Sequence, residues 1–130
     1  MILLDTHVAV WIELAPEKLS RRARARIHDA KSAGEPMAIA CVTLWEIAYK
    51  NSRDQLELFV PCELFLTELE ADFVVLPVDR NIAMYAAGFS DPFPRDPMDR
   101  LIAGTALANN LTLITRDDKI LRANACKTLW

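Results

Sequence analysis

Short apolar runs alternate with longer helical segments from one end of this chain to the other. Apolar runs of this kind predict buried strands, and strands that alternate with helices predict a mainly parallel sheet. We therefore assign the chain to the α/β class, with a mainly parallel central sheet of four to five strands. The expected strands are Ile2–Leu4, Met37–Cys41, Phe73–Leu76 and Leu111–Thr115, with a last short strand within Lys127–Trp130.

Helices are expected between these strands. The clearest is Glu17–Ser32, where Leu19, Ala23, Ile27 and Ala30 form an apolar stripe and basic side chains cover most of the remainder. This basic face, from Lys18 to Lys31, either follows an RNA backbone or is simply solvated. The other expected helices are Thr6–Ile12, Thr43–Lys50, one that starts at Pro61, Asp79–Phe89 with Ile82, Tyr85, Ala86 and Phe89 inside, one opened by Asp96, and a short one after Asp118.

The composition limits what the chain can be. Its 130 residues suit one compact domain with a hydrophobic core, so residues 1–130 are taken as a single domain. The net charge of -3 does not point to a nucleic-acid binder, although gathered acids can hide a basic face elsewhere. Cys41, Cys62 and Cys126 are an odd number without metal-ligand spacing, which favours reduced thiols in the cytoplasm. We find no signal peptide and no apolar run of the roughly 20 residues that a membrane span needs.

Acidic residues stand at equivalent points of the expected sheet. Asp5 follows the first strand, Glu46 the second and Asp117 the last long strand, while Asp99 lies in the first turn of the helix that precedes this last strand. The carboxyl ends of parallel strands meet at one edge, where open α/β sheets bind ligands. Carboxylates gathered there remain ionised together only if a cation neutralises them. Hard oxygen ligands of this kind predict a Mg²⁺ or Mn²⁺ site.

Each acid also has a purely structural explanation. Thr43 and Glu46 have the spacing of a capping box, and so do Thr115 and Asp118. The stretch Asp96-Pro97-Met98-Asp99 places a helix N-cap, a proline at the first helical position and an acid in the first turn. Capping explains any one of these residues, but it does not require all of them to lie at one edge of a sheet. Their shared placement therefore favours a metal site.

Four motifs in this order resemble those of the PIN-domain family, in particular the VapC-type toxins of bacterial and archaeal toxin–antitoxin pairs. The resemblance covers nearly the whole chain, although between residues 51 and 93 it rests only on the rhythm of helices and strands. It implies a PIN-like three-layer α/β/α fold. The motifs are Leu3-Leu4-Asp5-Thr6-His7, Thr43-Leu44-Trp45-Glu46-Ile47-Ala48, Asp96-Pro97-Met98-Asp99-Arg100-Leu101-Ile102-Ala103 and Leu113-Ile114-Thr115-Arg116-Asp117.

The resemblance implies a metal-dependent endoribonuclease, which hydrolyses RNA phosphodiester bonds with a metal-activated water. Mg²⁺ or Mn²⁺ would be held by Asp5, Asp99 and Asp117, and Glu46 would hold or orient a water. Asp96 would be a further ligand through water, or a helix cap. The family's four acids fall on Asp5, Glu46, Asp99 and Asp117, and a shift of one residue would exchange Asp117 for Asp118.

Other polar residues near the acids are expected to assist. Thr6 and Thr115 are suited to donate hydrogen bonds to a carboxylate or a phosphate, and Arg95 and Arg100 flank the acids where a phosphate would lie. We expect His7 to pack or to hydrogen-bond rather than to act as a general base.

Two protein partners follow from the resemblance. One is a second copy of the chain in a homodimer, and the other is a cognate antitoxin that wraps the toxin and fills its acidic cleft. The helices around Trp11, Trp45 and Phe65 carry more apolar surface than a small sheet needs, which is typical of an interface but also of an ordinary core. RNA is the expected substrate, and no membrane partner is expected.

Rival functions use the same class of fold. A phosphatase with Asp5 as nucleophile usually has a second acid two residues later, where this chain has His7. A receiver domain needs a phosphate-accepting aspartate after the third strand, where this chain has Leu76-Pro77-Val78. A non-catalytic or DNA-directed PIN-like domain stays open, although the presence of all four expected acids favours catalysis.

Overall fold

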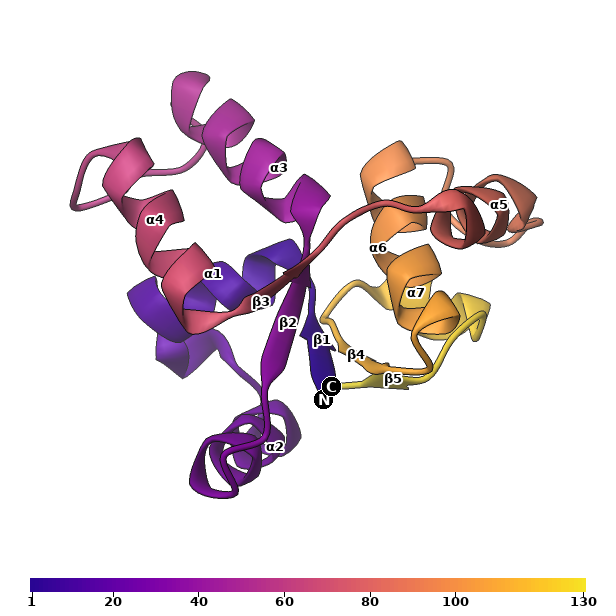
Figure 1. Ribbon diagram of the computed structural model, residues 1–130, viewed down its shortest axis with the longest axis horizontal. Helices are drawn as coiled ribbons and strands as arrows, with labels where there is room; N and C mark the ends of the chain where they lie inside the picture. The colour runs from indigo at the N-terminus through magenta and orange to yellow at the C-terminus, as the bar shows by residue number, and fades with distance from the viewer.

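A central sheet of five parallel strands organises the computed structural model, which describes residues 1–130. The sheet has β1 (Ile2–Leu4) at its centre, between β2 (Met37–Ala40) and β4 (Thr112–Ile114). Its edges are β3 (Val74–Leu76) and β5 (Thr128–Leu129), as Figure 1 shows. The α/β class and the parallel sheet of four to five strands that the sequence predicted are confirmed, including the short last strand.

Alternate residues of β1 face opposite sides of the sheet. Leu4 packs in one hydrophobic core together with Ile39 and Ile114, its partners in the two neighbouring strands. Leu3 packs in a second core on the other side, together with Leu113. Both faces of β1 are thus buried, which explains why the strand is apolar throughout rather than alternating.

Helices cover both faces and complete the three-layer α/β/α arrangement. The helices α1 to α4 share the first core with the sheet, α6 and α7 share the second, and α5 packs against α6. Figure 1 shows the two groups on opposite sides of the strands. The helices are α1 (Thr6–Leu14), α2 (Arg21–Ser32), α3 (Cys41–Ser52), α4 (Cys62–Asp72), α5 (Arg80–Gly88), α6 (Pro97–Ala108) and α7 (Asp118–Ala123).

Helix α2 begins later than the sequence predicted. Residues Pro16–Lys18 form a separate 3₁₀ turn instead of the first turn of the helix. The hydroxyl of Ser20 then caps α2 by accepting the Ala23 N–H at 3.0 Å. A serine N-cap satisfies one of the free N–H groups of the first turn, so it sets the start of the helix at Arg21 rather than at Glu17.

Helix α5 lies close against α6 at Gly104. A Cβ added to Gly104 would lie 3.1 Å from the carbonyl oxygen of Ile82 and 3.3 Å from the backbone nitrogen of Ala86. Tyr85, which we expected on the inner face of α5, is instead 46% exposed, whereas Ile82 and Ala86 are buried as expected. No helix of the chain has both the length and the apolar character needed to cross a membrane.

Candidate active site

The site is built at the carboxyl end of β1, where the order of the strands reverses. The connection after β1 and the connection after β4 leave the sheet at this point, which is the usual ligand-binding crevice of an open α/β sheet. Asp5 caps α1 there and is only 3% exposed. Its Oδ1 accepts the Thr6 N–H at 2.8 Å, and its Oδ2 accepts the Thr115 hydroxyl at 2.7 Å. Burial raises the pKa of Asp5 above its ordinary value.

The loop after β4 brings a second acid toward Asp5. The Thr115 hydroxyl that donates to Asp5 also accepts the Asp117 N–H at 3.0 Å, so one side chain fixes the spacing of the two acids. Asp117 caps α7, and its Oδ1 accepts the N–H groups of Lys119 and Ile120 at 2.8 and 3.2 Å. These bonds use one carboxylate oxygen and leave the other available to a ligand.

The adjacent acid, Asp118, has a different position. It is the first residue of α7 and is exposed, although it also borders the cleft described below. The predicted capping box of Thr115 and Asp118 is wrong, because Asp117 is the residue that caps this helix. Of the two neighbouring aspartates, the structure therefore connects Asp117 to Asp5.

A third acid comes from the first turn of α6. Asp96 caps this helix, as predicted, and its Oδ1 accepts two backbone N–H groups at 2.8 and 3.4 Å. Asp99 has no ion pair. Burial, followed by the charges of Asp96, Asp5, Asp117 and Glu46, raises the pKa of Asp99 to about 7. Acids from four parts of the chain thus act on one another at this edge of the sheet.

The fourth acid, Glu46, is carried by α3 rather than by a loop. Helix α3 begins directly after β2 without a side-chain cap, so the predicted capping box of Thr43 and Glu46 is wrong. The Thr43 hydroxyl instead lies 3.0 Å from the Thr6 hydroxyl, and both are buried. Glu46 is partly exposed, with Oε2 3.4 Å from the Lys50 ammonium. The Thr6–Thr43 contact links the start of α1 to α3 and hence Asp5 to the helix of Glu46.

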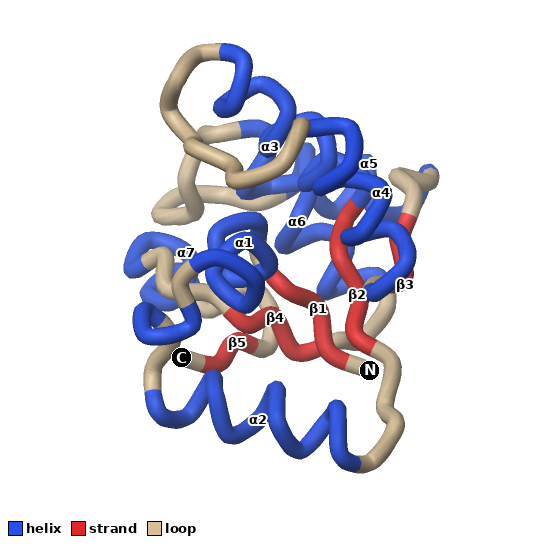
Figure 2. Tube along the Cα trace, turned by 90° about the vertical axis from the view of Figure 1, so that its left-hand side faces the viewer, coloured by secondary structure: helices blue, strands red, loops and turns tan.

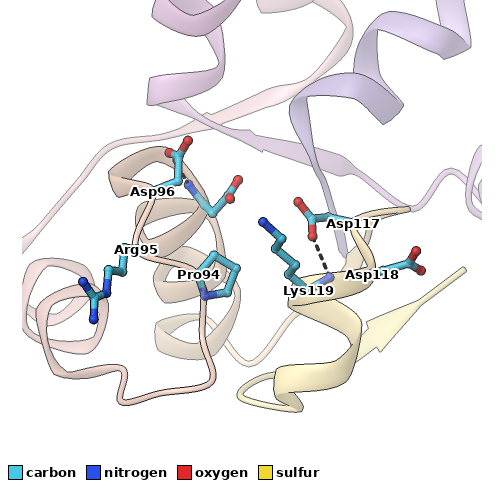
Figure 3. Close-up of a pocket in the computed structure, with 7 residues that line it drawn as sticks. Pro94, Arg95, Asp96, Asp117, Asp118 and Lys119 are labelled. Atoms are coloured by element: carbon cyan, nitrogen blue, oxygen red, sulfur yellow. Dashed lines mark hydrogen bonds between the residues drawn. The ribbon is translucent and has the colours of Figure 1, made fainter.

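A cleft of about 510 Å³ opens beside the acids. Figure 3 shows the Lys119 side chain extending toward the space between Asp96 and Asp117. Its ammonium makes no ion pair, although it is a cation in an acidic surrounding. Lys119 was not among the residues predicted from the sequence, where its only signal is its place in the first turn of a helix capped by an acid. The lining residues are Pro94, Arg95, Asp96, Asp99, Asp117, Asp118 and Lys119.

The donor set suits a divalent cation that keeps part of its water shell. No three His, Cys, Asp or Glu side chains are grouped closely enough to enclose a metal ion. A closed cage of that kind is typical of structural zinc, whereas Mg²⁺ is usually held by one or two carboxylates, waters and substrate phosphates. Asp99, which has no ion pair, and the second oxygen of Asp117 fit that description. Burial and then the neighbouring acids raise the pKa of Asp99, and a bound cation would offset both effects.

Comparison with known proteins identifies the family. The family model described as PIN domain matches residues 2–125. This chain belongs to the PIN domain family. It is 30% identical over 119 residues to Ribonuclease VapC22 of Mycobacterium tuberculosis, which covers 92% of this chain and 88% of that relative. The resemblance that the sequence motifs indicated is thereby confirmed.

Solved structures share the fold of this PIN domain. VapBC2 from Rickettsia felis, bound to a DNA fragment from its promoter, has a TM-score of 0.74 at 20% identity and covers 99% of this chain and 98% of that chain. VapBC-5 from M. tuberculosis, a member of the VapBC family of toxin–antitoxin systems, has a TM-score of 0.67 at 22% identity, with 98% and 96% covered.

In this PIN domain, His7 holds the loop after β4 against α1. Its Nε2 accepts the Arg116 N–H at 3.0 Å, and its Nδ1 lies 3.7 Å from Asp5 Oδ2. Because Nε2 accepts a hydrogen bond, the neutral ring carries its proton on Nδ1, on the side of Asp5. Burial lowers the pKa of His7, which favours this neutral form. The expected hydrogen-bonding role of His7 is confirmed.

The two arginines that we expected near a phosphate differ in their contacts. Arg100 donates to the carbonyl oxygens of Pro94, Ala86 and Phe89 at 2.9, 3.1 and 2.7 Å. These bonds brace the start of α6 against the end of α5 and the following loop, so its guanidinium is occupied by the protein itself. Arg95 is exposed at the rim of the cleft, and Figure 3 shows its guanidinium directed away from the acids.

The basic helix α2 lies away from the acids. Figure 2 shows it below the strands, whereas α3 and α6, which carry Glu46 and Asp99, lie above them. Part of its charge is used internally, because Arg26 makes a bidentate ion pair with Glu35 at 2.9 and 2.7 Å. Arg24 also donates to the carbonyl of Pro16. This arrangement favours a structural, solvated face over a path for RNA into the cleft.

Proposed function

We propose that this protein is the toxin of a toxin–antitoxin pair and that it cleaves RNA as an endonuclease. The proposal rests on one observation: acids directly after β1, in α3, in the first turn of α6 and directly before α7 lie at the strand-order reversal, where burial and then their charges raise the pKa of Asp99 to about 7. Such a site repels a phosphodiester unless a cation is present, so it suits metal-dependent phosphate chemistry better than simple phosphate binding. The similarity to a protein named Ribonuclease VapC22 supports RNA as the substrate.

The cation in this proposal is Mg²⁺ or Mn²⁺. Asp5, Asp99 and Asp117 would supply its protein ligands as an open set that does not enclose the ion and leaves positions for water, and Asp96 would reach it through a water. Such an ion, when bound, neutralises charge on the phosphodiester and lowers the pKa of a water that attacks phosphorus. Glu46 would orient that water, and its Oε2 lies 3.4 Å from the Lys50 ammonium.

The chain prepares these acids through contacts of its own. The Thr6 N–H and the Thr115 hydroxyl each bind one oxygen of Asp5 and so fix the plane of its carboxylate. Thr115 also positions Asp117 through its backbone N–H. Hydrogen bonds of this kind orient the ligands of a metal and tune their basicity, which makes Thr115 a positioning residue in the proposed mechanism.

A cognate antitoxin is the proposed protein partner. Trp45 and Tyr49 are stacked on the outer side of α3 with ring centroids 4.8 Å apart, and Trp45 is 56% exposed. Phe59, in the segment before α4, is 83% exposed. Apolar surface of this kind is typical of protein interfaces. Phe65, which we expected to add to it, is buried in the core instead, and the expected homodimer remains a prediction.

Cleavage of a mixed pool of tRNA and ribosomal RNA tests the proposal. Purified protein, freed of antitoxin, is incubated with Mg²⁺, with Mn²⁺ or with EDTA, beside an Asp5→Asn variant. We expect cuts only with metal, none in the variant, and 5′-phosphate ends on the products. Cuts that persist in EDTA or in a folded variant would contradict the assignment, and cuts in single-stranded DNA alone would favour a DNA-directed enzyme.

A further inference from the structure

A second, smaller cavity shares Asp117 with the acidic cleft. It has a volume of about 210 Å³ and is lined by His7, Trp11, Arg116 and Asp117. Asp117 also lines the larger cleft, so the two cavities meet at one of the acids of the proposed catalytic site. An extended polymer bound at the acids can therefore continue into this second cavity. Apart from Asp117, its lining is aromatic and basic, so it suits a different part of a ligand from the acidic cleft.

The aromatic part of the cavity is a cluster of three rings. The centroid of Trp11 lies 4.9 Å from that of His7 and 6.1 Å from that of Trp130, and His7 and Trp130 are 6.5 Å apart. His7 is held by its bond from the Arg116 N–H, and Trp11 packs against the first hydrophobic core while remaining partly exposed. Contacts within the protein thus hold His7 and Trp11 in place, and the exposed part of Trp11 is free to contact a planar ligand.

Two cations lie over the same tryptophan. The Arg116 guanidinium carbon is 5.7 Å and the Lys18 nitrogen 5.6 Å from the centroid of Trp11. Neither side chain makes an ion pair, so both charges are available to an anionic ligand. A partly exposed aromatic ring with free cations beside it suits single-stranded nucleic acid, whose bases stack on rings and whose phosphates contact the charges.

We propose that the cavity formed by His7, Trp11 and Arg116 is a subsite for one unpaired nucleobase of the RNA, next to the phosphate that is cleaved. The proposal deepens the proposed function and rests on it. The base stacks on Trp11, and Arg116 contacts the base or its neighbouring phosphate. Only a base outside a duplex can enter, because a paired base has both faces covered by its neighbours. The subsite therefore selects single-stranded segments and loops.

Binding to oligomers with and without bases tests the subsite. The protein carries Asp5→Asn to prevent cleavage, and each probe has about ten nucleotides, within the usual site size for single strands. One probe is oligoadenylate RNA, and the other is a ribose-phosphate chain of equal length without bases. We expect oligoadenylate to bind between about fivefold and a hundredfold more tightly, which is the effect of stacking one base.

Variants assign this preference to the cavity. Trp11→Leu should abolish the difference between the two probes, and Trp11→Phe should retain most of it. Arg116→Ala should weaken oligoadenylate binding while the fold is kept, because the backbone of Arg116, not its side chain, bonds His7. Trp45→Leu is the matched control: Trp45 is more exposed than Trp11 but lines neither cavity, so the preference should be unchanged.

Three results would overturn the proposal. They are equal binding of the two probes, an unchanged preference in both Trp11→Leu and Arg116→Ala, or loss of antitoxin binding in these variants with RNA binding intact, which would make the cavity a protein-docking surface. Failure of the proposed function is recognised separately. A wild-type protein that cleaves RNA but shows no base preference refutes only the subsite, whereas absent cleavage refutes the nuclease assignment.

Discussion

The two ends of the central strand place carboxylates in opposite electrostatic settings. At the amino-terminal end of β1, Glu35 from the segment before β2 accepts two hydrogen bonds from the Arg26 guanidinium and lies 2.7 Å from the amino group of Met1. These contacts, the hydrogen bond from Arg26 first, lower the pKa of Glu35 to about 2. Just after β1, Asp5 is buried beside other acids, and burial raises the pKa both of Asp5 and of Asp99.

This contrast separates a carboxylate that stabilises the fold from carboxylates that destabilise it. At Glu35 the chain supplies the neutralising charges itself, and folding gains from them. At Asp5 and Asp99, burial and neighbouring acids disfavour the charged form, so these ionised carboxylates reduce stability until a cation binds. Strain of this kind is typical of functional sites. Replacing an acid at one end should therefore have the opposite effect from replacing one at the other.

The largest effect should come from Asp5→Asn. The amide keeps the shape of the carboxylate but removes the charge of a proposed metal ligand, so cleavage should fall by more than about a hundredfold. The metal-free variant should melt at the same or a higher temperature than wild type, because a buried charge is gone. Cleavage assays measure the loss of activity, and thermal melting measures the change in stability. A loss of activity caused only by unfolding would contradict the contrast between the two ends of β1.

The second largest effect should come from Thr115→Val. It removes the donor to Asp5 and the acceptor for the Asp117 N–H, with little change in shape. Loss of such an orienting contact should lower activity by about tenfold to a hundredfold. It should also cost about 1–3 kcal/mol in the free energy of unfolding, since buried groups lose their partners. Thr115→Ser should restore both, and the comparison of kcat with denaturant unfolding tests this.

The destabilising effect of ionised Asp99 should appear in the pH dependence of stability. The pKa of Asp99 is about 7 in the folded chain against an ordinary 3.8, so the folded state binds the extra proton between these values. Metal-free stability should then fall as the pH rises through this window and level off above it. Asp99→Asn should flatten this part of the profile. Added Mg²⁺ should raise the melting temperature more above pH 7 than below it.

The smallest effect should come from Glu35→Gln. The low pKa of Glu35 means that its contribution is present above its ordinary pKa of 4.5 and is lost as the pH falls toward about 2. The variant should therefore melt slightly lower than wild type near neutral pH and differ little in strong acid. Cleavage should be unchanged, because Glu35 lies at the other end of β1 from the acids. A drop in kcat at unchanged stability would break the comparison.

The sequence predicted the features that depend on hydrophobic periodicity and on the order of strands and helices along the chain. Apolar runs located the strands, and the rule that parallel strands meet at their carboxyl ends brought Asp5, Asp99 and Asp117 together before any coordinates were known. Prediction from sequence failed where the residues of a local motif had a second possible structural role. Thr43 and Glu46 match a capping box, but α3 begins directly after β2, so Thr43 is a buried residue within the helix and not its cap.

Long side chains were the other source of error. The position of Arg100 next to Asp99 suggested a phosphate contact, yet three carbonyl oxygens of the α5 end and its loop bind the guanidinium. Lys119 and Arg116, on either side of Asp117, line the two cavities, but no periodicity marks them. The direction of a flexible side chain depends on neighbours that are distant in sequence, so tertiary structure is needed to assign it.

The hydrogen bond from Thr115 to Asp5 joins residues that are 110 positions apart. A ribosome makes the chain from its amino terminus, so Asp5 emerges long before the residue that holds it. A chain that has not yet reached α6 also lacks Asp99 and Asp117. The proposed nuclease is thus inert until these later segments are made, and until then the ribosome and messenger that produce it are not exposed to its activity.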